Sequence, residues 1–399
     1  MILRKDSFFK MLIILVYFIP LHIRDDIFGI FLPNDLAYTA AILLPIFVIF
    51  LIIIYNKVYK FVYVLFLFAL LILSLTYIFS IKDFSLIKVL SKYSPLLLTG
   101  VLIRNKDSFE RIFTFFLKCL NIIGIFMFFS WVVDYWITDS RPIVTIITSF
   151  VDNPYGSQSD RFYSFYTHPL NTKSILLQIA TINLLYGMYM KKNETKYFVN
   201  FLFFGLFSFV STQSKTGIII FALLLLVYIA LYKKSYKLML VTFPVIGILY
   251  VMGVFDKLLL RFQTTTLTSG RGDLLNLALE KSYYNPKLFV GYGEDFSSIY
   301  ATDILGWNYG FEYFAIIVAI DYGIIFTFLI LLLMIICPLV LSIKYKFIPI
   351  FLMVVLIFID LNSYNALVVK TSEMMIMYSI FVMICINIIF HRFKSYENG

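Results

Sequence analysis

The sequence is organised around the polar stretch at residues 256–310, whose centre reads Ser269-Gly-Arg-Gly-Asp273 and whose second glycine turn reads Gly291-Tyr-Gly-Glu-Asp295. Leu274 and Leu277 follow the first turn at helical spacing, which predicts a short helix between the two turns. Apolar runs long enough to cross a bilayer flank the stretch on both sides. Residues 256–310 are therefore predicted to form one large loop between membrane spans.

Arg271 stands at the predicted start of the short helix in this loop. Asp273 or Ser269 can cap the helix, so its unpaired amides and its dipole point toward Arg271, as in anion sites at helix N-termini. A guanidinium is a planar fork of donors that stays charged, which suits the oxygens of a phosphate or diphosphate. The alternative is an ion pair with Asp273 or Glu280 that holds the loop closed. Residue type and spacing favour anion recognition.

The composition is that of a membrane protein. The 399 residues are 61% hydrophobic and 14% charged, with a mean hydropathy of +0.91. The net charge of +10 comes from lysines and arginines concentrated in short loops between apolar runs, which is a topology signal and not one for nucleic acid. Cys119, Cys337 and Cys385 lie far apart inside apolar runs, so they are predicted to be packing residues and not disulfides or metal ligands.

We predict an all-α, polytopic transmembrane protein that forms a single membrane domain over residues 1–399, with about 12 spans of about 20 residues each. The first span is expected to remain as a signal anchor. The residues at 86–103 are the weakest span and could be a re-entrant piece. The spans are predicted at residues 8–23, 36–55, 61–80, 86–103, 112–138, 172–190, 197–213, 217–232, 238–255, 311–336, 347–361 and 374–390.

The distribution of basic residues predicts the orientation. With both termini in the cytoplasm, more than half of the 33 lysines and arginines fall in short inner loops. The outer side then receives residues 138–171, the hairpin at 211–217, the large loop at 256–310 and the loop at 361–373. All the polar residues that look suited to chemistry fall on this outer side.

Two outer segments carry further candidates. Arg161 and His168 stand seven residues apart in an aromatic setting just before a span, which suits either the membrane interface or sugar stacking. Lys215 lies in a polar hairpin; it either extends to the interface or presents its charge to a lipid phosphate. Asp321 lies about ten residues into a span, where an acid is costly unless it faces a cavity or a partner. It could line a substrate or proton path, or pair with a buried lysine.

These segments resemble the O-antigen polymerase (Wzy) and O-antigen ligase superfamily of integral membrane glycosyltransferases over nearly the whole chain. The resemblance rests on short motifs in a fixed order on one side of the membrane. In ligases a histidine usually stands just before the asparagine at the end of the large loop. Here that asparagine is Asn308, and Trp307 precedes it, which favours a polymerase. The motifs are Arg161, His168-Pro-Leu-Asn171, Ser214-Lys-Thr-Gly217 (more often Arg at the position of Lys215), Ser269-Gly-Arg271, Gly291-Tyr-Gly293, Asn308 and Gly323.

The resemblance implies a polymerase in the bacterial inner (plasma) membrane that transfers a glycan from undecaprenyl diphosphate to a lipid-linked repeat unit. Its leaving group is a lipid diphosphate, so Arg271 and Arg161, with Lys215, are predicted to stabilise the developing charge. Glu294, Asp295 or His168 could accept the acceptor proton, and Glu294 is the first choice. We assign substrate binding to Lys215 and to Asp295, Asn308 and Tyr309.

The predicted partners are the bilayer, the lipid-linked glycan and a chain-length regulator, without nucleic acid. No cofactor is expected. The outer side holds no Asp-x-Asp motif and no His and Glu at metal-ligand spacing, so we expect metal-independent chemistry. Two alternatives stay open: a ligase that moves finished glycan to another acceptor, and a transporter or flippase without covalent chemistry, which would place its polar groups near the bilayer midplane.

The predicted orientation can be tested by labelling single cysteines from the two sides of the membrane. Cysteines at Ser235 and Thr302 should react with impermeant reagents from opposite sides, because these positions fall in loops of opposite predicted side. Labelling of both positions from one side would overturn the topology and the outer location of the candidate residues.

Overall fold

The computed structural model describes residues 5–79, 86–138, 142–143, 161–162, 164, 166, 168–191, 193–233, 289–306, 311–367 and 373–397, with isolated positions between 244 and 277. The chain is helical apart from one two-residue strand pair within these ranges. Six of the described helices are long and apolar enough to cross a membrane, which confirms an all-α, multi-pass architecture. They cover Asn34–Tyr55, Lys60–Phe79, Lys106–Ile137, Lys215–Lys233, Ile324–Lys344 and Glu373–Arg392.

The first part of the chain forms a layer of helices closed by a short antiparallel pair. In this pair Lys57 lies opposite Leu102 and Val58 opposite Val101. The elements are α1 (Lys5–Tyr17), α2 (Leu21–Gly29), α3 (Asn34–Tyr55), β1 (Lys57–Val58), α4 (Lys60–Phe79), α5 (Leu86–Tyr93), the 3-10 helix η1 (Ser94–Gly100), β2 (Val101–Leu102), α6 (Lys106–Val132) and its π-helical extension η2 (Val133–Ile137).

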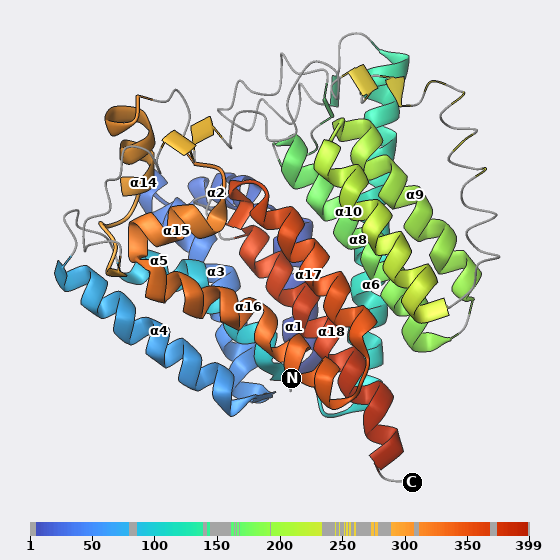
Figure 1. The fold of residues 1–399 in the computed structure, drawn as a ribbon, viewed down its shortest axis with the longest axis horizontal. Coiled ribbons are helices and arrows are strands. Elements are labelled where there is room, and N and C mark those ends of the chain that lie inside the picture. The colour runs from blue at the N-terminus through green and yellow to red at the C-terminus, as the bar shows by residue number, and fades with distance from the viewer. Residues whose placement is uncertain are drawn as a thin grey trace.

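The second part supplies the remaining helices, which pack both beside α6 and against α4 (Figure 1). They are α8 (Pro169–Met190), α9 (Glu194–Thr212), α10 (Lys215–Leu226) with its π-helical extension η3 (Val227–Lys233), α14 (Phe296–Ile299) with the π-helix η5 (Tyr300–Ile304), α15 (Phe314–Tyr322), α16 (Ile324–Lys344), α17 (Ile348–Asn362), the 3-10 helix η6 (Asn365–Leu367) and α18 (Glu373–Glu397).

Two helices are buried on nearly every side and form the centre of the protein. In α8 all side chains from Thr172 to Met188 are buried. In α18, 94% of the residues in its most apolar stretch are buried. By contrast, α3 and α4 expose large apolar side chains such as Ile54 and Leu67. A helix that is apolar all round belongs in a protein core or in lipid. The outer helices are therefore suited to face the acyl chains, and α8 and α18 to pack within protein.

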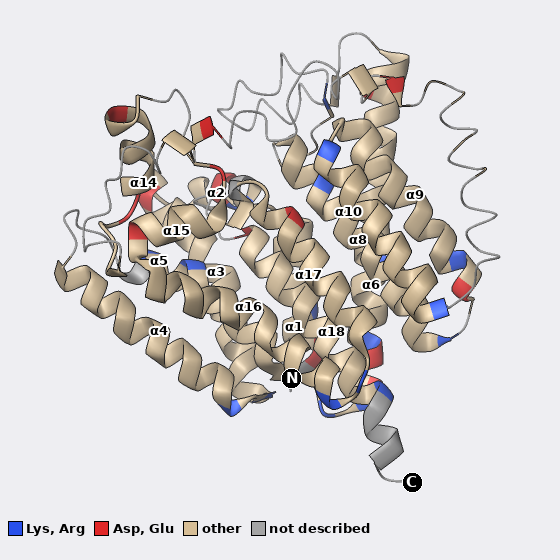
Figure 2. Ribbon diagram, viewed as in Figure 1, with Lys and Arg blue, Asp and Glu red and all other residues tan. Residues whose placement is uncertain are grey.

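The segments predicted to lie on one side of the membrane gather at one end of the bundle. His391 Nε2 lies 2.6 Å from the carbonyl oxygen of Ile103, and the Arg392 guanidinium stacks 4.7 Å from the ring of Phe347. Both termini lie at this end, and Figure 2 shows lysines and arginines clustered there. The opposite end carries the acidic residues around α2, α14 and α15. The described segments around Ile103, Phe347 and His391 thus lie together at the end of the bundle that carries the termini.

Three predicted spans are interrupted in the structure. The apolar run at 8–23 breaks between α1, which ends at Tyr17, and α2, which begins directly after Pro20; proline has no amide to donate and is tolerated at such a helix start. The run at 86–103 consists of the eight-residue α5 and the 3-10 helix η1, so it does not form one continuous spanning helix. The run at 311–336 breaks at Gly323, which has φ of 89°. The predicted span at 238–255 and most of the loop at 256–310 lie outside the described residues.

Gly323 is required where it stands. Its φ lies in the left-handed region that glycine adopts without a steric penalty, and a Cβ there would collide with the backbone of Phe289. Gly291 has a φ of 77°, and a Cβ at this position would collide with backbone atoms of Asp321 and Tyr322. The second glycine turn of the large loop therefore packs directly into the break between α15 and α16.

Candidate functional site

The turn between α9 and α10, at the end of the bundle away from the termini, receives the segment that carries Arg161. The amide of Phe162 donates to the carbonyl of Ser211 at 3.0 Å, and Arg161 Nε donates to the carbonyl of Thr212 at 2.8 Å. Lys215 begins α10 on the same turn. Two of the predicted anion ligands, from segments about 50 residues apart in sequence, are therefore brought to one turn.

Lys215 is packed within protein. Its side chain is buried, as is that of Ser214, whose hydroxyl accepts a hydrogen bond from the amide of Gly217 at 3.2 Å and so caps α10. The charge of Lys215 thus sits in the first turn of a capped helix. One of the two sequence interpretations extended the Lys215 side chain to the membrane interface. Its burial within protein does not agree with that interpretation.

His168 caps α8. Its Nδ1 accepts a hydrogen bond from the amide of Leu170 at 3.2 Å, and Pro169 follows at the first helical position, where the missing N–H costs nothing. With Nδ1 as the acceptor, the neutral ring carries its proton on Nε2. In this arrangement His168 is suited to donate a hydrogen bond, whereas taking a proton at Nδ1 would break the cap.

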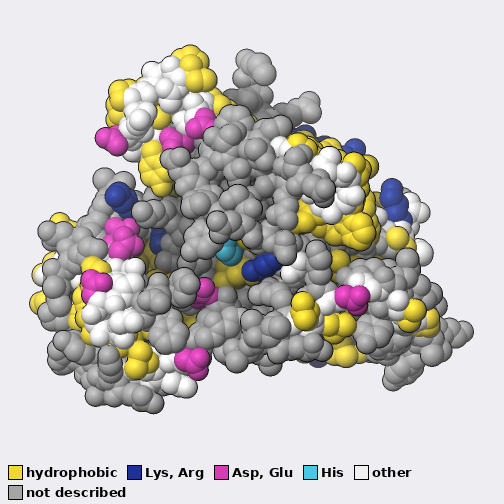
Figure 3. All heavy atoms as spheres, turned by 90° about the horizontal axis from the view of Figure 1, so that it is seen from above, with side chains coloured by type: hydrophobic (Ala, Val, Ile, Leu, Met, Phe, Trp, Pro, Cys, Tyr) yellow, Lys and Arg dark blue, Asp and Glu magenta, His cyan; other side chains and the backbone are white. Residues whose placement is uncertain are grey.

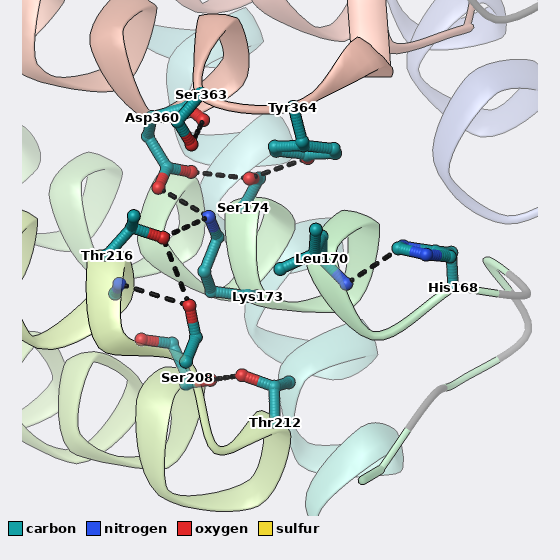
Figure 4. Close-up of polar contacts among 12 residues, drawn as sticks. His168, Leu170, Lys173, Ser174, Ser208, Thr212, Thr216, Asp360, Ser363 and Tyr364 are labelled. Atoms are coloured by element: carbon teal, nitrogen blue, oxygen red, sulfur yellow. Dashed lines mark hydrogen bonds and ion pairs between the residues drawn. The ribbon is translucent and has the colours of Figure 1, made fainter. Parts of the chain in front are cut away.

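A buried polar cluster lies directly behind the α9–α10 turn (Figure 4). Lys173 and Asp360 are 0% and 1% exposed and form an ion pair, with 2.7 Å between Nζ and Oδ1. The Ser174 hydroxyl donates to Asp360 Oδ2, and the Tyr364 hydroxyl donates to Ser174 at 2.7 Å. Lys173 Nζ also donates to the hydroxyl of Thr216 at 3.3 Å. The cluster therefore connects α8 and α17 to the polar turn.

The sequence interpretation missed Lys173 and Asp360. Both residues lie in or beside apolar runs, and an ionisable residue within such a run usually marks a partner or a site. A second pair was missed for the same reason. Arg24, 3% exposed, lies 2.8 Å from Glu373 and joins α2 to the start of α18. What the sequence does not show is which acid meets which base, because the partners are 187 and 349 residues apart.

Glu294 and Asp295 belong to a different part of the same end. The amides of Tyr292 and Gly293 donate to the carbonyls of Ile320 and Asp321 at 3.0 and 2.9 Å. This pairing holds the Gly291–Asp295 turn against the last turn of α15. In Figure 1, α14 and α15 lie at the left of this end and α8 and α10 at the right. The structure does not bring the preferred base together with Arg161 and Lys215.

Asp321 is 3% exposed and has a local role in this second region. Its Oδ1 accepts a hydrogen bond from the amide of Ser297 at 2.7 Å, so the carboxylate caps the short helix α14. Lys92 in α5 interacts electrostatically with the Asp321 carboxylate. Of the two sequence interpretations, a partnered acid is the one that these contacts favour.

Three of the predicted site residues, Arg271, Asn308 and Tyr309, lie outside the described residues. Leu274, three positions after Arg271, is 3% exposed and belongs to a small apolar cluster with Tyr300 and Phe311. The positions at 273–274 and 276–277 are helical, as the spacing predicted. Figure 3 looks onto this end of the molecule and shows a histidine and basic side chains exposed near its centre.

The Lys173–Asp360 pair predicts an asymmetric response to mutation. Lys173→Met or Asp360→Leu alone should lower the free energy of unfolding by about 3–5 kcal/mol, because each leaves an uncompensated buried charge. The double variant should recover much of that loss. Thermal unfolding in detergent gives the comparison.

The control for this experiment is Lys233→Ala, which removes a more exposed ion pair with Glu194. It should cost at most about 1 kcal/mol. Wild-type stability in Lys173→Met would show that the pair contributes nothing to the fold.

No protein-family model, curated protein or solved structure matches the chain. Any function assigned to it therefore rests on the chemistry of its own residues.

Proposed function

We propose that this chain is a membrane glycosyltransferase that polymerises lipid-linked repeat units of an O-antigen, capsule or exopolysaccharide. In the proposed reaction a hydroxyl of the acceptor sugar attacks the anomeric carbon of the growing glycan. The bond from that carbon to undecaprenyl diphosphate breaks, the diphosphate leaves with the bonding electrons, and the hydroxyl proton passes to a base. The proposal includes about twelve spans, cytoplasmic termini, a location in the bacterial inner membrane and a large outer loop at 256–310.

The observation that carries this proposal is that Arg161 bonds to the α9–α10 turn and Lys215 begins the helix that follows the same turn, in a multi-pass membrane protein. A diphosphate leaving group needs several fixed positive charges near the membrane surface, and preorganised donors are usually the largest catalytic contribution. Arg161 is oriented by its bond to the carbonyl of Thr212. Lys215 is held in the first turn of a capped helix, where the helix dipole also favours an anion. Both fixed charges suit a phosphate ligand.

The candidate bases for the acceptor proton lie in two different parts of this end of the molecule. His168 holds its cap through Nδ1, which leaves it better suited to donate to an oxygen of the substrate. Glu294 and Asp295 lie with α14 and α15. The acceptor hydroxyl attacks the carbon that carries the diphosphate, so the base must lie within hydrogen-bond reach of that hydroxyl, close to the cations that bind the diphosphate. The separation of Glu294 and Asp295 from Arg161 and Lys215 therefore argues against either carboxylate as the base.

A transporter is the second candidate, and one observation favours it. Transporters place broken helices and ionisable side chains within the membrane. Here Gly323 interrupts a predicted span, and Lys173 and Asp360 form a buried ion pair. However, these charges neutralise one another within a packed core: Lys173 bonds to Thr216, Asp360 accepts from Ser174, and Tyr364 donates to Ser174. The cluster suits a rigid support for the turn better than a mobile carrier site.

The first test of the enzyme is Arg271→Ala. Loss of one preorganised donor to a developing anion typically lowers the rate about 10²–10³-fold, so long glycan chains should disappear and single lipid-linked repeats accumulate. Arg271→Lys should restore activity only partly, because a point charge cannot make a bidentate contact.

The matched control is Arg104→Ala, an exposed arginine near the opposite end of the bundle, which should leave chain length unchanged. Normal polymer from Arg271→Ala would make Arg271 a spectator and Arg161 the leading diphosphate ligand. If the Arg271→Ala variant fails to reach the membrane, Arg271 supports the structure of the loop, and Arg161→Ala is then the decisive variant.

Metal independence gives a second test, which also separates the enzyme from a transporter. Purified protein in detergent, with no second compartment, should extend lipid-linked repeats in excess chelator. No group of three or more His, Cys, Asp or Glu side chains at metal-binding distances occurs in the described part of the chain. Activity lost in chelator and restored by magnesium or manganese would show that carboxylates such as Asp295 hold an ion. No product under either condition would favour the transporter.

A further inference from the structure

A polar groove lies at the end of the bundle that carries both termini, far from the α9–α10 turn. It is formed by α1, the first turns of α6 and the end of α8, and its volume is about 480 Å³. The side chains that matter to its chemistry are Lys10, Asp107, Glu110, Arg111, Phe115 and Lys118. Except for Lys10, they come from one face of α6, because positions three, four and seven apart share a face of a helix.

Two of the charged residues in this groove, Arg111 and Glu110, already have charged partners. Arg111 donates to one oxygen of Asp6 through Nε at 3.0 Å and Nη2 at 2.8 Å. Glu110 accepts from the hydroxyl of Tyr189 at 3.3 Å, and it lies 3.9 Å from Lys106. These contacts hold the Arg111 and Glu110 side chains in place at the wall of the groove.

Lys10 and Lys118 are different. Neither forms an ion pair with a carboxylate in the part of the chain that the structure describes. The ammonium of Lys10 lies 5.4 Å from the ring centroid of Phe115, which keeps it over the groove. Two cations without a carboxylate partner therefore line one groove.

The depth of Lys118 shows what it can reach. The helix Lys106–Ile137 has 32 residues, so it is about 48 Å long at ~1.5 Å per residue. The hydrocarbon core is about 30 Å thick, which leaves roughly 9 Å of helix, about six residues, outside it at each end. Lys118, about 18 Å from the start of the helix, then lies inside the hydrocarbon edge. Side chains in a helix point toward its N-terminus, so its ammonium is directed back to the headgroup layer, as snorkelling lysines are.

The surface beyond the two lysines is apolar. Ile14 lies one turn after Lys10 on α1 and is 40% exposed, and Ile122 lies one turn after Lys118 on α6 and is 57% exposed. Ile125, a further turn along α6, is also exposed. Each cation is thus followed by exposed apolar side chains on its own helix face, in the direction of the membrane centre. A ligand that fits both features has an anionic head and a hydrocarbon tail.

We propose that this groove binds a glycerophospholipid from the leaflet next to the two termini, with its phosphodiester between Lys10 and Lys118 and an acyl chain along Ile14 and Ile122. Charge-assisted bonds from ammonium groups to phosphate oxygens are strong, and basic pockets between membrane helices recognise lipid headgroups in this way. Asp107, at the rim of the same groove, can accept from an ammonium beyond the phosphate. Phosphatidylethanolamine carries both a phosphate and an ammonium, so it can bond to the two lysines through the phosphate and to Asp107 through the ammonium.

Native mass spectrometry of the purified full chain tests this site. In mixed micelles the wild type should retain phosphatidylethanolamine but not a diacylglycerol with the same acyl chains, which lacks only the phosphate headgroup. Lys10→Ala/Lys118→Ala should bind it at least about tenfold more weakly, which corresponds to ~1.4 kcal/mol. Lys118→Arg should bind it normally. The matched control is Lys60→Ala, which removes an exposed lysine at the same end of the bundle and should change nothing.

Three results would overturn the proposal. Equal retention of diacylglycerol would show that the headgroup is not recognised, and equal retention by the double variant would show that the lysines are not the ligands. Displacement of the lipid by millimolar inorganic phosphate would identify a site for free anions instead. If the double variant is not monodisperse on size exclusion, Lys118→Gln against Lys118→Arg decides the same question.

Discussion

The ion pair between Lys173 and Asp360 fixes the part of the fold on which the proposed site depends. A charge inside a membrane protein must meet its opposite and fill its remaining hydrogen bonds, because no water is at hand to do so. Lys173 forms an ion pair with Asp360. Thr216 accepts from Lys173, Ser174 donates to Asp360, and Tyr364 donates to Ser174. This requirement sets how α8 and α17 face each other. Since Thr216 belongs to the cluster, it also sets where α10 begins.

The same logic explains the rest of the proposed site. Once α9 and α10 are held, the turn between them exposes the carbonyls of Ser211 and Thr212, and Phe162 and Arg161 bond to them. His168 then begins α8 with its ring as the cap. A rigid scaffold of this kind keeps cations in place without reorganisation during a reaction, which is what stabilisation of a leaving diphosphate requires. In the proposed function the buried pair acts by positioning these cations.

Broken helices supply the second constraint. At Gly323 the chain leaves α15 and enters α16 with a conformation that other residues rarely adopt, and the backbone of Phe289 and Val290 occupies the space that a side chain would need. This opening admits the Gly291–Asp295 turn, whose amides bond to the end of α15. Glu294 and Asp295 are consequently tied to α15 and not to the α9–α10 turn. The end of the molecule thus offers a cationic region and an acidic region side by side on one broad face.

The sequence by itself determined that this is an all-α, multi-pass membrane protein. Long apolar runs form helices in lipid because each helix bonds its own backbone, whereas the side of the membrane on which each loop lies stays a prediction from the basic residues. Only the tertiary structure decided that Pro20 and Gly323 interrupt predicted spans, that Lys173 meets Asp360, and that Arg161 and Glu294 belong to different regions. These outcomes depend on which helices, distant in sequence, pack together. Hydropathy is a local property of each segment, so it does not show which other helix that segment will contact in the fold.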